Sequence, residues 1–169
     1  MGLLDALFGS PMGDVRAALN KFTPTAGLTT EAKYRDALTL HLSSALRVSP
    51  KREAGIHGQG TRVDIFFEHR DEDFIVTIKQ GINEQKTKIL LGEAVIVAAS
   101  LLLNEHPRRT NVVVLVILDG KKPAALDGHL RALGTGMGLL SRHASAADEG
   151  NVGFHLALGD SDGIAIRGD

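Results

Sequence analysis

The chain has 169 residues, 43% of them hydrophobic and 23% charged, which suits one globular domain and excludes a disordered or fibrous protein. Its 19 Lys and Arg residues nearly balance its 20 Asp and Glu residues, and the formal net charge is −1. Strong overall attraction to nucleic acid or to an anionic membrane is therefore excluded, although a local basic patch is not. The chain has no cysteine, which excludes disulfides, thiolate metal sites and cysteine nucleophiles.

Residues 1–27 are predicted to form an N-terminal helical segment and a linker, and residues 28–169 a single domain. The helical segment breaks near Ser10-Pro11, because proline disfavours helical backbone in the residue before it. We expect its apolar patch to dock on the protein core rather than on a membrane or a partner; the patch consists of Leu3, Leu4, Leu7 and Phe8. No stretch has the pattern of a secretory signal or the roughly 20 apolar residues of a membrane span, so we expect a cytoplasmic protein.

The next part of the chain predicts one helix followed by three strands. Thr30 offers an N-cap, and apolar residues at helical spacing follow it, which indicates a helix over residues 31–47. Apolar and polar residues then alternate along a strand that carries Asp64 on the side opposite its buried residues. We expect strands over residues 48–56, 61–69 and 74–79, with a solvated turn at residues 70–73.

The second half of the chain predicts two helix–strand units. An uninterrupted apolar run at residues 112–118 is typical of a strand covered on both faces. We expect a helix over residues 84–104 before it, and after it a helix over 124–142, a strand over 152–158 and a tail over 159–169. The order α–β–β–β–α–β, then α–β, predicts an α/β fold with a mixed central sheet flanked by helices.

Several familiar binding motifs are missing from the sequence. Three glycines at 134, 136 and 138 lie inside a predicted helix, which favours a loosened or closely packed helix over a dinucleotide site. The seven histidines lack the spacing of zinc ligands, and no P-loop is present. Residues 160–163 match only the start of a calcium loop, so we expect a polar turn there.

One group of residues suits phosphodiester chemistry. Asp64 lies on one predicted strand, while Thr77 and Lys79 share a face of the next, so a hairpin register can bring Asp64 and Lys79 together. Glu31 begins the preceding helix, and Glu53 lies on the strand before. Carboxylates near a lysine suit a site where a divalent cation activates water and the lysine stabilises developing charge or helps to deprotonate the water.

These segments resemble the PD-(D/E)xK nuclease superfamily, whose restriction-endonuclease-like core has the order α–β–β–β–α–β. The resemblance covers roughly residues 28–120, and its matching segments are Glu31 with Tyr34 and Leu38, Arg52-Glu53, Gly60–Ile65, Ile75–Lys79 and Leu90–Glu93. The resemblance implies that Asp64 binds the metal, that Lys79 is the catalytic lysine and that Glu31 completes the site. Mg2+ or Mn2+ is the implied cofactor.

Thr77 departs from the family pattern, because the family has an acidic residue at that position of its (D/E)xK motif. A neutral hydroxyl is a poor ligand for Mg2+. The family sometimes moves this acid to the following helix, where Glu84 and Glu93 occur. Glu93 is the better candidate, because it interrupts an apolar run and a charge on that face requires a partner or a metal. The implied metal ligands are therefore Asp64, Glu31 and Glu93.

Two functional hypotheses remain, and a third ranks last. The first is a nuclease-like protein that acts on DNA by Mg2+-dependent hydrolysis with an atypical site; the basic residues expected to follow the phosphate backbone are Lys51, Arg52, Arg62, Lys86 and Lys88. The second is a catalytically inactive nuclease-fold module for protein assembly or nucleic-acid binding. An isolated Asp more commonly just forms an ion pair, which for Asp64 would be with Arg52 or Arg62. The third, a small-molecule-binding domain, lacks a cofactor fingerprint. A protein partner or a second copy of the chain stays open, and no membrane is expected.

Overall fold

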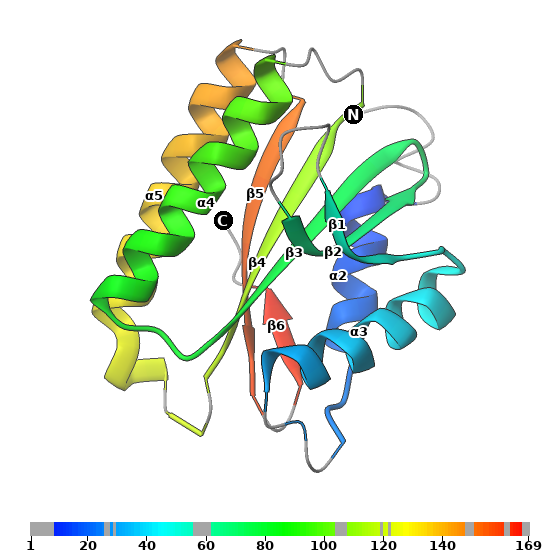
Figure 1. The fold of residues 1–169 in the computed structure, drawn as a ribbon, viewed down its shortest axis with the longest axis horizontal. Coiled ribbons are helices and arrows are strands. Elements are labelled where there is room, and N and C mark those ends of the chain that lie inside the picture. Colours follow the sequence, from blue (N-terminus) through cyan, green and yellow to red (C-terminus); the bar gives the residue numbers. More distant parts are fainter. Residues whose placement is uncertain are drawn as a thin grey trace.

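The computed structural model describes residues 9–25, 28, 30–55, 62–103, 108–118, 120–121, 123–147, 151–160 and 163–166. They form a six-stranded mixed sheet whose strands follow one another in chain order (Figure 1). The strands are β1 (Lys51–Gly55), β2 (Arg62–His69), β3 (Glu72–Gln80), β4 (Thr110–Ile117), β5 (Val152–Gly159) and β6 (Ile164–Ile166). The predicted α/β fold with a mixed sheet flanked by helices is confirmed.

Strand direction reverses three times across the sheet. β1, β2 and β3 are joined antiparallel, β4 and β5 then run parallel to β3, and β6 returns antiparallel to β5. All eight residues of β4 are buried, as the uninterrupted apolar run predicts. The long connections between the parallel strands carry helices, because a tight turn cannot join parallel neighbours.

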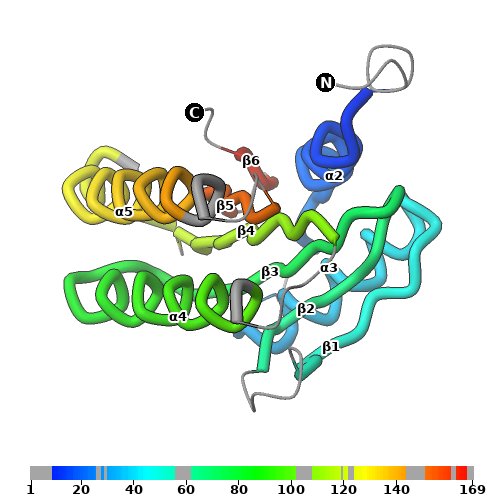
Figure 2. The backbone as a smooth tube through the Cα atoms, turned by 90° about the horizontal axis from the view of Figure 1, so that it is seen from above, coloured from blue at the N-terminus to red at the C-terminus, as the bar shows by residue number. Residues whose placement is uncertain are grey.

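Helices cover both faces of the sheet (Figure 2). One face packs against α4 (Glu84–Leu103) and α5 (Asp127–Ala147), which follows the short 3-10 helix η1 (Pro123–Leu126). The other face packs against α2 (Pro11–Asn20) and α3 (Glu31–Leu46). No helix in the described part of the chain is long and apolar enough to cross a membrane.

Side-chain caps fix where the first two described helices begin. The Ser10 hydroxyl accepts a hydrogen bond from the Gly13 N–H, so α2 begins where the sequence predicts a break. Thr30 caps α3 in the same way, which places Glu31 in the first turn of that helix. The apolar patch predicted within residues 1–8 lies outside the described residues.

The solvated turn predicted at residues 70–73 is wrong in its second half. Only Arg70 and Asp71 form the turn, with φ values of 49° and 65°, as in two-residue hairpin loops. β3 already begins at Glu72, and Asp73 is 3% exposed. The Arg108 guanidinium lies 3.5 Å from the Asp73 carboxylate. The charged run around Asp73 predicts exposure to solvent, but a residue distant in the sequence pairs with it.

The tail predicted at residues 159–169 contains the sixth strand. β6 pairs with residues 157–159 of β5, and Ile164 is buried at its start. Its three residues are too few for an alternating pattern to stand out in the sequence. Within the polar turn expected at residues 160–163, the described residues Asp160 and Gly163 are joined by backbone and side-chain hydrogen bonds.

Candidate active site between the second and third strands

The candidate site lies where β2 and β3 separate. The paired residues of these strands end at Ile65 and Val76. Beyond that pair, Oδ2 of Asp64 accepts a hydrogen bond from the Ile78 backbone N–H at 2.7 Å. A carboxylate therefore replaces the neighbouring strand as the partner of this N–H.

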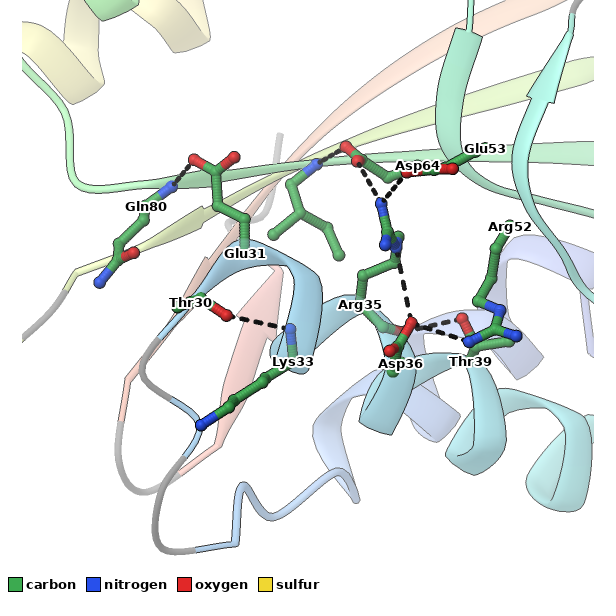
Figure 3. A network of polar contacts seen from close by, with 11 residues as sticks. Thr30, Glu31, Lys33, Arg35, Asp36, Thr39, Arg52, Glu53, Asp64 and Gln80 are labelled. Atoms are coloured by element: carbon green, nitrogen blue, oxygen red, sulfur yellow. Dashed lines mark hydrogen bonds and ion pairs between the residues drawn. The ribbon is translucent and has the colours of Figure 1, made fainter.

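Glu31 makes the equivalent contact further along β3. Its Oε1 accepts a hydrogen bond from the Gln80 backbone N–H at 2.8 Å (Figure 3). Beyond Val76, β2 no longer pairs with this edge of β3. Asp64 and Glu31 instead accept hydrogen bonds from the N–H groups of Ile78 and Gln80, two residues apart on that edge. The second oxygen of each carboxylate has no hydrogen bond to a described residue.

A pocket of about 240 Å3 occupies this point of the fold. Residues of α3, β2, β3 and α4 line it, among them Glu31, Arg62, Asp64, Thr77, Lys79 and Glu93. β2 and β3 are antiparallel neighbours, as the sequence predicts. The structure therefore places the expected metal ligands, the expected catalytic lysine and Thr77 around one pocket, although they come from four separate elements.

The cation paired with Asp64 is Arg35 of α3. Its Nη1 lies 4.0 Å from Oδ1 of Asp64 and donates a 2.8 Å hydrogen bond to Oε1 of Glu53. Its Nε lies 3.6 Å from Asp36, so one guanidinium contacts three carboxylates (Figure 3). The Arg35 side chain is only 17% exposed, which strengthens these contacts relative to pairs in open solvent.

Arg35 is a residue that sequence reasoning missed. The alternative partners proposed for Asp64 lie elsewhere: Arg52 pairs with Asp36 at 3.0 Å, and Arg62 is an exposed residue of the pocket wall. The sequence does contain a signal for it: Arg35 lies four residues after Glu31, and residues four apart share one face of a helix.

Glu53, which accepts the hydrogen bond from Arg35, has a strained backbone. Its φ is 48°, in the left-handed region, which costs a non-glycine residue roughly 1–2 kcal/mol. The paired residues of β1 and β2 skip Glu53 and resume at Ala54. Such strain is typical of positions where the surrounding structure fixes a functional geometry.

Burial raises the pKa of Asp64 above its ordinary value of 3.8. The negative charge of Glu31 acts in the same direction, whereas the Ile78 N–H, Arg35 and Lys79 favour the ionised form without cancelling the effect of burial. A half-buried carboxylate with a perturbed pKa in a pocket is a typical candidate for function. A bound cation would relieve both the burial cost and the repulsion between Asp64 and Glu31.

The basic residues predicted to contact nucleic acid come from β1, β2 and α4. Arg62 lines the site pocket, and Lys86 lines a neighbouring pocket of about 300 Å3 that also contains Glu31 and Lys121. Lys88 and Arg52 are exposed and form ion pairs with acidic residues of their surroundings, and Lys51 is exposed on β1. Lys121 is a cation near the site that the sequence did not single out.

The acidic residues of α4 differ in position. Glu93 is half-buried and lines the site pocket. Glu84, the alternative source of the missing acid, is exposed and pairs with Lys88 at 2.7 Å. Among the described residues, no three Asp, Glu or His side chains lie close enough to hold a metal ion. Mg2+ sites commonly use one or two carboxylates with water and substrate phosphate, which is what Asp64 and Glu31 offer.

No protein-family model and no curated protein matches the chain. A solved structure of Pyrococcus furiosus SfsA in complex with Ca2+ is similar over 86% of this chain and 74% of that chain. The two sequences are 14% identical and the TM-score is 0.39. We infer neither a fold family nor a function from a similarity of this size.

Proposed function

We propose that this chain acts on DNA and that the pocket between β2 and β3 is a site for divalent-cation-dependent hydrolysis of a phosphodiester. The observation that carries this proposal is the shared pocket of Glu31, Asp64 and Lys79. These residues lie far apart in the sequence, and the resemblance to PD-(D/E)xK nucleases assigns the same three to one site.

The residues of the pocket divide the chemistry among them. Oδ1 of Asp64 and the second carboxylate oxygen of Glu31 remain for Mg2+ or Mn2+, since their other oxygens are bonded to β3. A cation bound there would polarise the phosphodiester and lower the pKa of a water molecule. The Lys79 ammonium would stabilise the negative charge that develops on the phosphate during attack.

Nearby cations would hold the flanking phosphates of the substrate. Arg62 lines the site pocket, and Lys86 and Lys121 line the pocket beside it. The net charge of −1 provides no long-range attraction. We therefore expect modest affinity for DNA that falls steeply as the salt concentration rises.

An inactive nuclease-like module is the second candidate, and two features of the site favour it. Arg35 already neutralises part of the charge on Asp64, and Thr77 lacks the carboxylate of the (D/E)xK pattern. In this alternative the pocket holds no cation, and the protein serves in assembly or in nucleic-acid binding.

One pair of measurements separates these candidates. Calorimetric titration with Mn2+ reports cation binding, and incubation with labelled single- and double-stranded DNA in Mn2+, with EDTA as the control, reports cleavage. The proposal expects about one bound Mn2+ per chain and cleavage that EDTA abolishes. DNA binding without Mn2+ binding would support the inactive module. Absence of both activities would overturn the proposed action on DNA.

A further inference from the structure

A second and larger cavity, of about 740 Å3, lies between α5 and β5. Neither element contributes to the candidate active site. Pockets that bind small organic molecules have volumes of about 300–1,000 Å3. The size of the cavity therefore suits a ligand rather than a few water molecules.

One face of α5 forms a wall of this cavity. Arg131, Thr135, Gly138 and Arg142 line it at spacings of four, three and four residues, which place them on one side of the helix. The two arginines are 11 positions apart, about 16 Å along a helix. The wall thus carries a cation at each end and small residues between them.

Packing does not explain the glycines of this wall. A Cβ at Gly138 would meet no atom within 4 Å, and one at Gly134 would reach only Leu156 at 3.9 Å. Gly136, by contrast, is closely packed, because a Cβ there would lie 2.5 Å from Leu91 of α4. A glycine inside a helix costs about 1 kcal/mol relative to alanine. At Gly134 and Gly138 the absence of a side chain leaves the cavity open.

The charges at the cavity favour an anionic ligand. Its described lining includes Arg109, Arg131, Arg142 and His155 but no carboxylate. Arg131 pairs with Asp127 at 2.6 Å, and Nε of Arg109 lies 4.0 Å from Glu72. Exposed Arg142 has no ion pair with a described residue. Arginine binds phosphate through paired N–H donors. The apolar remainder of the lining consists of Leu130, Met137, Val152, Phe154 and Leu156.

The edge of β5 is not free to bind a peptide strand at this point. The Phe154 backbone N–H donates to the Ser141 hydroxyl of α5 at 2.9 Å, so the helix already takes up this outward-facing donor. At Phe154 the cavity therefore offers a side-chain hydroxyl instead of a backbone donor. This observation favours a small molecule over an extended peptide.

We propose that the cavity between α5 and β5 binds a nucleoside monophosphate. Arg109 and Arg142 hold the phosphate, the hydroxyls of Thr135 and Ser141 meet the ribose, and the apolar wall that includes Met137 receives the base. Each class of group on the ligand has a counterpart in the lining. The proposal involves none of the residues of the candidate active site and does not depend on the proposed hydrolysis.

Titration calorimetry with AMP, GMP, CMP and UMP tests the proposal, with adenosine and inorganic phosphate as partial ligands. At least one nucleotide should bind, and adenosine and phosphate should bind roughly tenfold more weakly or worse. Arg142→Gln should weaken nucleotide binding roughly tenfold, whereas Lys33→Gln, which removes an exposed charge on α3, should leave it unchanged.

A second pair of variants tests the cavity itself. Gly138→Leu fills the space, while Gly128→Leu makes the same change at an exposed position of α5 where a Cβ also meets nothing within 4 Å. Both variants should fold, because leucine favours helix over glycine. Only Gly138→Leu should abolish binding. The proposal is overturned if all four nucleotides fail to bind at millimolar concentration, if phosphate alone binds equally well, or if Gly138→Leu binds like the parent protein.

Discussion

Asp64 accepts the hydrogen bond that Ile78 would otherwise give to a neighbouring strand, with 2.7 Å between Oδ2 and the backbone nitrogen. The carboxylate is thereby held at the point where β2 and β3 separate. Its burial there raises its pKa, so the ionised form is held at a cost to stability. A carboxyl group whose ionised form costs stability in this position is better explained by binding than by folding.

Asp64→Asn should stabilise the protein at neutral pH. The amide oxygen can still accept the Ile78 hydrogen bond, but no charge is buried. The pKa of Asp64 in the folded protein lies above the unfolded value of 3.8. At pH values between the two, the folded state therefore binds more protons than the unfolded state does. Stability contributed by Asp64 therefore falls as the pH rises from 3.8 through the folded-state pKa.

Thermal unfolding across this pH range measures the effect. The melting temperature of Asp64→Asn should exceed that of the parent protein at pH 7. The difference should disappear below pH 3.8, where both states of the parent protein hold a protonated Asp64. A lower melting temperature for Asp64→Asn at pH 7 would show that the ionised carboxylate contributes to stability instead.

Removal of either proposed catalytic group should abolish DNA cleavage. Asp64→Ala deletes a proposed cation ligand and Lys79→Ala deletes the proposed stabiliser of phosphate charge, so we expect rates to fall roughly 100-fold or more. Lys33→Ala, an exposed change on α3, is the control and should cleave normally. Cleavage that survives Asp64→Ala would indicate a contaminating nuclease.

The sequence predicted most of the fold because the signals that set it are local. Alternation along β2, the apolar run of β4 and the Thr30 cap of α3 each reflect a few adjacent residues. The errors arose where distant partners decide. Asp73 looks solvated until Arg108 is brought beside it, and β6 forms only because β5 offers an edge.

The residues of the candidate site were likewise predicted only in part. Strand parity and the family resemblance together singled out Asp64, Lys79 and Glu31, which line one pocket. Arg35 was missed because its contacts with Asp64 and Glu53 join segments far apart in the chain. The glycines at 134, 136 and 138 were interpreted as one feature, whereas Gly136 meets α4 and the other two line a cavity.

Arg35→Gln should raise the affinity for Mn2+. It removes a positive charge 4.0 Å from Oδ1 of Asp64, which competes with a cation for that oxygen. We expect a gain of roughly tenfold, since a neighbouring charge at this distance shifts the pKa of a carboxylate by about one unit or more. Calorimetric titration of the folded variant measures it.

Arg52→Gln is the matched control for this change. Arg52 also pairs with Asp36 but has no contact with Asp64, so its loss should leave Mn2+ affinity unchanged. An unchanged or weaker affinity in Arg35→Gln would show that Arg35 supports the geometry of the site rather than competing with the cation.

Thr77 decides whether the site lacks a carboxylate. No three acidic or histidine side chains among the described residues form a ready metal site, so we expect Thr77→Glu to supply the missing ligand. Mn2+ affinity should rise roughly tenfold, and cleavage should increase with it. Thr77→Gln, which adds the same length without the charge, should do neither.

Glu93→Gln tests the opposite arrangement, in which the acid has moved to α4. Glu93 lines the same pocket, so a small rearrangement on cation binding would bring it to the ion. In that case Glu93→Gln would be the damaging change, and Thr77→Glu would crowd the ion and add nothing. We expect instead that Glu93→Gln reduces Mn2+ affinity less than Asp64→Asn does, because Asp64 is held at the strand edge by a backbone hydrogen bond. Titration of the three variants side by side distinguishes these arrangements. If none of them binds Mn2+, Thr77→Glu included, the inactive module is the function that remains.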